Sequence, residues 1–482
     1  MKFKNKKYIV LSLSVAALAS CSAPKTASNK EINALPKAFA QDTVKKTQSY
    51  TPVTLNAYFN DAALQNLFTK AKAANPDLLI TQQRITIANA FLTKAKLMNL
   101  PSLEIGATAQ GNRYGKYTMD GVGNFDTNLS QNITEDQKVN RDFTPNYWIG
   151  AQTSWEIFAW GKLKNQKLAA RKRFLATTKG IELVQNQLFT DIATLYYQLV
   201  ALDKKLEIYE NNSKIQQRAH EIINAQRIAG KANELAVQQF NAQNNNILAE
   251  VEKIKIEIVS TEKAILTLIG EYGGTVERGQ NFDTNQFEIL NQEIAVDEVI
   301  HNRPDVAENY NELEATKADV KAARSAFFPR LELSASLGYN AFSAHTLFKP
   351  ASLATQVLGG LFVPVFNKGQ IKYEFNVAKA QQEIAFLNYQ KSVTTAYNEL
   401  SQLLKHIEIN HKILDLKQEE VQFLERAVEV SNDLYLTGYA NYLEIINSQK
   451  NKLQAELDLL DAQHQNTKTS ILLFKALGGK VN

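Results

Sequence analysis

The 482-residue chain repeats its pattern of prolines and glycines once, at nearly constant spacing. Two prolines recur after 228 residues and three glycines after 208 residues. Because glycine and proline differ most from other residues in backbone freedom, a match confined to them indicates matched breaks in structure rather than shared chemistry. The pattern predicts two copies of one architecture plus end segments. The matched residues are Pro76, Pro101, Gly161, Gly230 and Gly270 in the first copy, and Pro304, Pro329, Gly369, Gly438 and Gly478 in the second.

Residues 1–20 have the features of a secretory signal peptide. A basic start precedes an apolar stretch, Tyr8 to Ala19, that is too short to span a bilayer. The stretch ends in Leu18-Ala19-Ser20-Cys21, which resembles a bacterial lipobox. That resemblance implies cleavage before Cys21 and a diacylglycerol on its thiol, with palmitate as the expected acyl group; the alternative is an incidental buried cysteine. Residues 21–60 are polar and are expected to form the lipid anchor and an extended tether.

The composition favours neither nucleic-acid binding nor catalysis. The formal net charge is +5, but four lysines lie in the signal peptide, and their removal leaves +1, so no nucleic-acid partner is expected. The six histidines are scattered, and the chain contains no cysteine cluster, nucleophile elbow or phosphate loop. We therefore expect no enzyme, no metal site and no cofactor apart from the covalent lipid on Cys21.

Two long tracts without proline show helical periodicity. Between Ile181 and Leu206 apolar residues recur every three or four positions, as in the seam of a coiled coil. One helix over residues 162–229 would be roughly 100 Å long at about 1.5 Å per residue, and it is too polar to lie in a bilayer. Each copy is therefore expected to form a long antiparallel helical hairpin. The expected helices are 162–229 and 231–268 around Gly230, and 370–437 and 440–476 around Gly438.

Each copy also has the composition of a capped helix start upstream of these tracts. Asn75 precedes Pro76 and Asp77, as expected for a cap, a proline at the first helical position and a carboxylate near the positive end of the dipole. Residues 302–305 repeat this arrangement. Their expected role is architectural, not catalytic.

Between the prolines and the first long helix of each copy, the period changes to two. Apolar and polar residues alternate from Leu103 to Gln110 and again from Leu331 to Asn340, with return strands about 149–157 and 356–366. The segments approach the length of a transmembrane β-strand, roughly 9 to 11 residues, and aromatic residues lie towards their ends. The alternative is a soluble hairpin packed on helices. The loop of the first hairpin, 112–146, is about 20 residues longer than that of the second, which accounts for the change of offset.

Four strands cannot close a barrel, and lipid does not tolerate an open sheet edge. If the strands enter a membrane, several chains must share one barrel. Two chains would supply eight strands and three would supply twelve. Because side chains fill an eight-stranded barrel, a conducting pore favours three or more chains.

Four motifs, in this order and in a duplicated chain behind a lipobox, resemble those of outer-membrane efflux channels of the TolC and OprM type, in particular the lipidated members that serve resistance-nodulation-division pumps. The motifs are Arg303-Pro304-Asp305-Val306, Phe327-Phe328-Pro329-Arg330-Leu331, Tyr435-Leu436-Thr437-Gly438 with Leu443-Glu444-Ile445-Ile446, and Ala476-Leu477-Gly478-Gly479.

The resemblance implies a mixed α and transmembrane β fold with two structural repeats. Four β-strands per protomer would join a shared 12-stranded barrel in a homotrimer, continuous with a long α-helical coiled-coil barrel. The expected divisions are a signal peptide (1–20), the lipid anchor and tether (21–60), repeat 1 (61–270, with its β-hairpin about 102–159), an inter-repeat segment of the equatorial region (271–303), and repeat 2 (304–482, with its β-hairpin about 331–366).

The implied function is that of the outer-membrane exit channel of a tripartite efflux pump. The channel would be anchored in outer-membrane lipid, with a large periplasmic extension, and would passively conduct substrates from an inner-membrane efflux transporter and a periplasmic adaptor protein. Two alternatives stay open: a periplasmic coiled-coil lipoprotein with a structural or adhesive role, and the exit duct of a type I secretion system. The sequence does not name the exported compound.

The resemblance also assigns roles to the helical turns. It implies that the turns contact the adaptor and close the channel at rest; the alternative is helix-ending glycines without a partner. Glu444 follows Gly438 by six residues, where the family often has a gate carboxylate, although a lone glutamate on a helix is usually a solvated surface group. The acidic pattern departs from the family at Asn447 and at Ala236, with Glu234 nearby. The expected adaptor contacts are Gly230, Lys231, Ala232, Gly438, Tyr439 and Ala440, and the expected gate residues are Glu444, Asn447 and Glu234.

Overall fold

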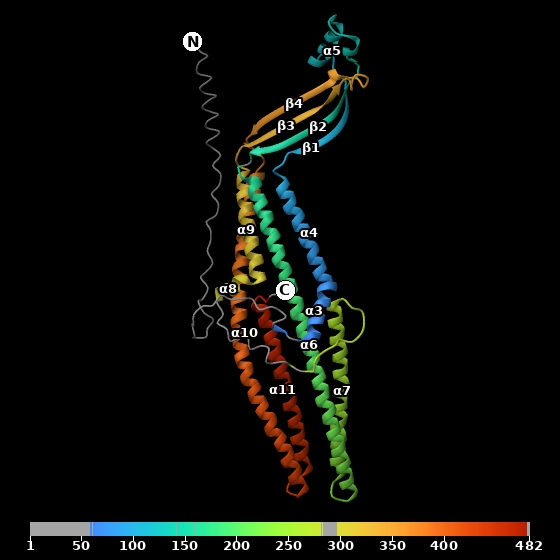
Figure 1. Cartoon of the computed structure of the whole chain (residues 1–482), viewed down its shortest axis with the longest axis vertical. Helices are drawn as coiled ribbons and strands as arrows, with labels where there is room; N and C mark the ends of the chain where they lie inside the picture. Colours follow the sequence, from blue (N-terminus) through green and yellow to red (C-terminus); the bar gives the residue numbers. More distant parts are fainter. Residues whose placement is uncertain are drawn as a thin grey trace. The chain divides into compact units, whose positions relative to one another are not determined.

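The computed structural model describes residues 58–59, 61–140, 142–158, 160–280, 282 and 296–479, and it is mostly helical with one four-stranded sheet (Figure 1). The expected signal peptide, the lipid site Cys21 and nearly all of the expected tether lie outside the described residues, as do residues 283–295 of the expected inter-repeat segment. No helix in the part of the chain that the structure describes is both long enough and apolar enough to cross a membrane.

The order helix, strand, strand, long helix, helix occurs twice (Figure 1). The first occurrence consists of α4 (Pro76–Leu97), β1 (Ser102–Asn112), β2 (Thr144–Phe158), α6 (Lys162–Ile228) and α7 (Glu234–Ile269). The second consists of α9 (Pro304–Ser325), β3 (Arg330–Ala341), β4 (Leu353–Phe362), α10 (Gln370–Leu436) and α11 (Tyr442–Ala476). Shorter elements are α3 (Ala62–Ala74), α5 (Met119–Leu129), η1 (Glu135–Gln137), α8 (Val296–Asn302) and η3 (Pro350–Ser352).

The six matched glycines recur for one physical reason: all six have positive φ angles, which glycine adopts more readily than other residues. Four of them end a helix in the Schellman arrangement, in which the two residues after the helix donate back to its last carbonyls. Gly230 N, for example, donates to Arg227 O at 3.0 Å, and Lys231 N donates to Gln226 O at 2.8 Å. The other two, Gly161 and Gly369, lie directly before the long helices.

The described residues form two compact units by their contacts. We call residues within 88–174 and 312–386 the sheet unit, and those within 61–87, 175–311 and 387–479 the helical unit. The sheet is antiparallel throughout in the order β1-β2-β3-β4, so β1 and β4 form its edges.

The sheet has one apolar and one polar face. Strand pairing places Ile105, Ala151, Leu337 and Thr355 in one row and Glu104, Gln152, Ser336 and Gln356 in the neighbouring row. Large apolar side chains of the apolar face are exposed, with Ile105 83% exposed and Val357 70% exposed. A soluble hairpin packed on helices would bury these side chains, so the observed exposure argues against that alternative.

Two details of the hairpins differ from the sequence-based expectation. The return strand β4 ends at Phe362 and not at 366, because Pro364 has no N–H to donate to the ladder. The long first loop contains α5 and η1, whereas the expectation was a polar loop. The Thr118 hydroxyl caps α5 by accepting a hydrogen bond from Gly121 N at 3.1 Å.

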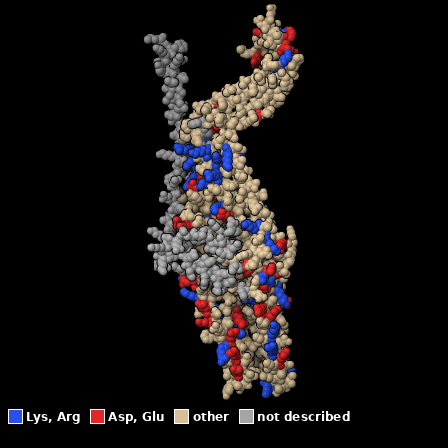
Figure 2. All heavy atoms as spheres, viewed as in Figure 1, with Lys and Arg blue, Asp and Glu red and all other residues tan. Residues whose placement is uncertain are grey.

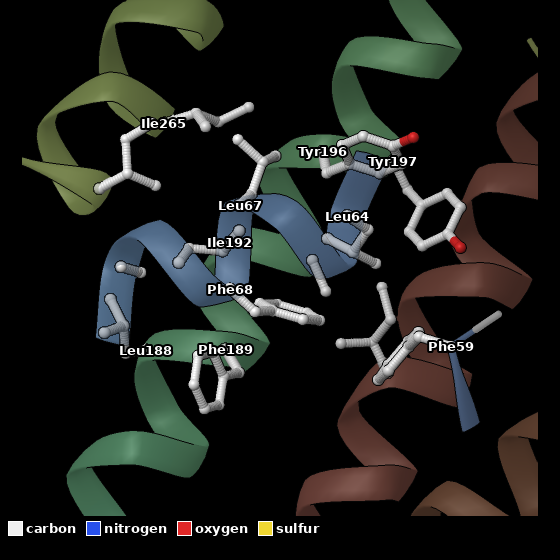
Figure 3. Close-up of a cluster of buried hydrophobic side chains, with 14 of the residues drawn as sticks. Phe59, Leu64, Leu67, Phe68, Leu188, Phe189, Ile192, Tyr196, Tyr197 and Ile265 are labelled. Atoms are coloured by element: carbon white, nitrogen blue, oxygen red, sulfur yellow. The ribbon is translucent and has the colours of Figure 1, made fainter. Parts of the chain in front are cut away.

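The main core of the helical unit joins α3, α6, α7 and α11 (Figure 3). Phe68 of α3 packs edge-on against Phe189 of α6, with ring centroids 4.8 Å apart. Ile192 and Ile265 are fully buried in the same cluster. Tyr58 donates from its hydroxyl to Ser470 O of α11 at 2.8 Å, which ties the start of the described chain to the last helix.

Arg303 joins the start of α9 to the end of α11 within the helical unit. Its guanidinium donates to Ala476 O at 3.1 Å and forms ion pairs with Asp305 (2.9 Å) and Glu399 (2.7 Å), while only 5% of the residue is exposed. Burial opposes the charged form, but the hydrogen bonds and charges of the two carboxylates outweigh it and raise the pKa of Arg303. The motif is architectural in this structure.

Candidate functional site: the helical turns

The first turn connects α6 to α7 through Gly230, Lys231 and Ala232. Gly230 has φ of +74°, and a Cβ added there would meet nothing within 4 Å. Lys231 is exposed, whereas Ala232 is half-buried. The Asn233 side chain caps α7 by accepting from Ala236 N at 3.0 Å. The turn therefore has a glycine with open space where a side chain would lie, followed by a capped helix.

The second turn connects α10 to α11 and has the same geometry. Gly438 has φ of +81° with open space around its absent Cβ. Tyr439 N donates to Leu434 O at 2.9 Å, and Asn441, which lies 208 residues after Asn233, caps α11 by accepting from Leu443 N at 2.8 Å. Tyr439 is 85% exposed and Ala440 is half-buried.

The expected gate residues lie just beyond these turns, and no hydrogen bond or ion pair among the described residues joins them to one another. Glu444 and Asn447 are exposed on α11. Glu234 lies in the first turn of α7, where it accepts from Gln238 Nε2 at 2.7 Å and lies 3.5 Å from Arg227 Nε. Within the described chain Glu444 has no ion-pair partner, so its carboxylate is open to groups outside the chain.

The structure adds a link between the two turns that the sequence reasoning did not predict. Tyr435 of α10 donates from its hydroxyl to Gln226 Oε1 of α6. Burial raises the pKa of Tyr435, although the bond to Gln226 opposes the shift, so the hydroxyl stays protonated and can donate. An apolar cluster of Ile223, Val237 and Phe240 with partly buried neighbours, Ala232 and Tyr435 among them, supports the same junction.

A second polar link lies further along the hairpins. Gln216 Nε2 of α6 donates to Gln449 Oε1 of α11 at 3.0 Å, and both side chains are buried. Gln216 falls on the three- and four-residue spacing that continues from Leu206, so a polar residue at an apolar seam position was the available signal.

These links fix the two hairpins to each other near their turns. Among the described residues, no group of three or more His, Cys, Asp or Glu side chains could hold a metal ion.

Comparison with known proteins identifies a protein family and individual proteins whose sequences are similar to this chain. The sequence profile of the outer membrane efflux protein family matches residues 67–271 and 295–479. The cation efflux system protein CusC of Escherichia coli K12 is 23% identical over 439 residues, which cover 90% of this chain and 91% of that protein. The probable outer membrane lipoprotein SilC of Salmonella typhimurium is 25% identical over 363 residues, which cover 73% of this chain and 77% of SilC.

The fold is also that of a solved transmembrane channel. A crystal structure of CusC superimposes with a TM-score of 0.82 at 21% sequence identity and covers 94% of this chain and 99% of that one. The family profile extends over most of the chain and includes both helical turns. The chain belongs to the outer membrane efflux protein family.

Proposed function

We propose that this protein is the exit channel of a tripartite efflux pump and conducts substrates passively across the outer membrane. The observation that carries the proposal is the sheet with one exposed apolar face, whose strands continue directly into helices of 67 residues. Strands of 10 to 15 residues suit a membrane span, and a helix of that length would reach roughly 100 Å from it. Together they would line a path through a membrane and far beyond it.

The edges of the sheet support a shared barrel. Within the described residues, β1 and β4 each pair on one side only. In lipid the remaining backbone groups must be paired, so we infer that chains join β1 to β4. Three chains give a 12-stranded barrel with the polar face inward, in a homotrimer whose long helices form a coiled-coil barrel below it.

The two helical turns are the proposed contacts for a periplasmic adaptor protein, through Gly230, Lys231 and Ala232 and through Gly438, Tyr439 and Ala440. Exposure of Lys231 and Tyr439 fits this role. Glu444, with Asn447 and Glu234, is the proposed gate, because three copies of an unpaired carboxylate would form a ring that favours cations. The bond from Tyr435 to Gln226 implies that the two hairpins of one chain move together, with opening between chains.

The proposed division of the chain follows from this arrangement. Residues 1–20 would direct export, Cys21 would carry the lipid, and 21–60 would form the tether. Residues 61–270 and 304–482 would form the two repeats, and 271–303 would contribute to the equatorial region. An inner-membrane transporter supplies the energy in this scheme, and the protein itself catalyses nothing.

The turn assignment is tested by Gly438→Val in the producing bacterium, with Gly438→Asn as the matched control. Valine strains a left-handed backbone by about 1–2 kcal/mol, whereas asparagine tolerates it. Compounds are first screened against a strain that lacks the gene, to find one that is more toxic without the channel. We expect Gly438→Val to restore little resistance while the oligomer still forms, and Gly438→Asn to restore it. Normal resistance with Gly438→Val would contradict the turn assignment.

A further inference from the structure

The end of α6 beside the sheet is strongly basic, and the matching end of α10 has a smaller excess of lysine. Of the twelve residues from Lys162 to Arg173, six are lysine or arginine and none is acidic. The corresponding twelve residues of α10, 370–381, contain two lysines and one glutamate. Figure 2 shows lysine and arginine gathered on this part of the surface, next to the strands. The start of α6 therefore carries a concentration of positive charge that no acidic residue of the same stretch balances.

Helix stability does not explain this charge. The amino-terminal end of a helix carries a partial positive charge and favours acidic residues. Neither α6 nor α10 has an acidic residue in its first turn, and Lys162 and Lys164 lie where the dipole disfavours cations. An anionic group outside the helices would offset this cost.

Five of these cations also form no ion pair in the part of the chain that the structure describes. We call Lys164, Lys167, Arg171, Lys372 and Lys379 the basic belt; all five are exposed and none forms an ion pair within the described residues. Some lysines further along the helices do pair within the chain, as Lys255 does with Glu252 and Lys405 with Glu408, each at 2.7 Å. The belt charges are thus available to an external anion.

Both copies contribute to the belt in the same way. Lys164 and Arg171 are seven residues apart on α6, so they lie on one face of that helix. Lys372 and Lys379 repeat this pair on α10 after 208 residues. In a trimer the two pairs per chain would give six basic stripes around the channel.

Exposed apolar and aromatic residues separate the belt from the strands. Trp160 lies between β2 and α6 and is 49% exposed, while its indole N–H donates to Pro329 O. Val365 and Phe366 lie between β4 and α10 and are 84% and 86% exposed. Apolar strands, then aromatic residues, then lysines is the order expected across a membrane–water interface.

We propose that the basic belt binds the headgroups of anionic phospholipids at the membrane surface from which the helices emerge. The inference rests on the proposed function, because it needs the sheet to lie in the membrane. Phosphate groups of the lipid would neutralise the unpaired lysines and arginine, while the acyl chains would cover the exposed residues above them. This fixes the depth of the barrel in the leaflet independently of the lipid on Cys21.

The test compares two full-length variants with equal loss of charge. The belt variant carries Lys164→Gln, Arg171→Gln, Lys372→Gln and Lys379→Gln. The control carries Lys263→Gln, Lys391→Gln, Lys450→Gln and Lys468→Gln, at exposed lysines of the helical unit that form no ion pair within the described residues. Native mass spectrometry measures phosphatidylglycerol and phosphatidylcholine retained by each protein, and planar-bilayer conductance is recorded in parallel.

Wild type and control are expected to prefer phosphatidylglycerol, and the belt variant to lose about tenfold or more of that preference, since each basic residue near an anionic surface contributes severalfold. All three proteins should conduct. Equal phosphatidylglycerol retention by the belt variant would overturn the inference, and so would an altered ion selectivity with unchanged lipid binding, which would place the belt in the pore. A wild type that conducts but shows no lipid preference would contradict the inference about the basic belt and leave the proposed function intact. A wild type that never conducts would contradict the proposed function as well.

Discussion

At the scale of single residues, Arg303 shows how one side chain can donate a hydrogen bond to the end of a helix that is distant in the sequence. It donates to Ala476 O near the end of α11, and Asn75, 228 residues earlier, donates to Leu268 O near the end of α7 at 2.9 Å. The sequence predicted the local half of this arrangement, because Asn75 caps α4 by accepting from Leu78 N at 3.0 Å. The other half joins residues 173 and 193 positions apart, which no local pattern reveals.

Replacing Arg303 by alanine should destabilise the protein strongly. The change leaves Ala476 O and the carboxylates of Asp305 and Glu399 without their donor, which we expect to cost about 3 kcal/mol. The exposed pair of Arg426 with Glu429 offers a matched control, whose loss should cost less than about 0.5 kcal/mol. Unfolding midpoints of the purified proteins measure the difference. Equal midpoints for Arg303→Ala and Arg426→Ala would refute the structural role.

His464 should make the helical unit sensitive to acid. Burial lowers the pKa of His464, with a further contribution from Lys468 that Asp461 opposes, and its Nε2 has no hydrogen-bond partner among the described residues. The unfolded chain therefore binds the proton more tightly, so stability is lost as pH falls below the ordinary value of 6.5. His464→Gln should show a smaller drop in unfolding temperature between about pH 8 and about pH 5 than wild type. An unchanged drop would show that His464 is not responsible.

At the scale of elements, the long helices were predictable and the structure of the loop in the first hairpin was not. The expected helices over 162–229 and 370–437 agree closely with the observed Lys162–Ile228 and Gln370–Leu436. These ends were predictable because a glycine ends each helix, and its effect on the backbone is local. The helix α5 contains Gly121 and Gly123, so its composition favours a loop. Side-chain bonds hold this region, including the reciprocal pair between Asn128 and the backbone of Val139 at 2.7 and 2.8 Å. Composition carries no sign of that pair.

Pairing of β2 with β3 should depend on two facing glycines. A Cβ at Gly150 would lie 2.4 Å from Leu337 O and 2.5 Å from the Cα of Gly338, so Gly150→Ala must push the strands apart. Gly359→Ala in β4 is the matched control, since its Cβ would make only an ordinary contact of 3.9 Å with Leu333. We expect Gly150→Ala to cost about 1–3 kcal/mol and to reduce the yield of folded protein from membranes. Equal yields of the two variants would contradict this account of the pair.

At the scale of the whole molecule, alternation along the strands predicted a sheet with one apolar and one polar face, and the exposed apolar face of the sheet agrees with it. The sequence could not show how the two hairpins of one chain join near their turns. That junction depends on single contacts, from Tyr435 to Gln226 and from Gln216 to Gln449, between residues more than 200 positions apart. The gate and adaptor roles concern groups outside one chain and remain proposals.

The central claim is that several copies of this chain form a channel through a membrane. Purified full-length protein, with its mass determined in detergent, is added to a planar lipid bilayer and single-channel currents are recorded. The account predicts a trimer that gives discrete conductance steps of uniform size. A monomer that gives no conductance would contradict it.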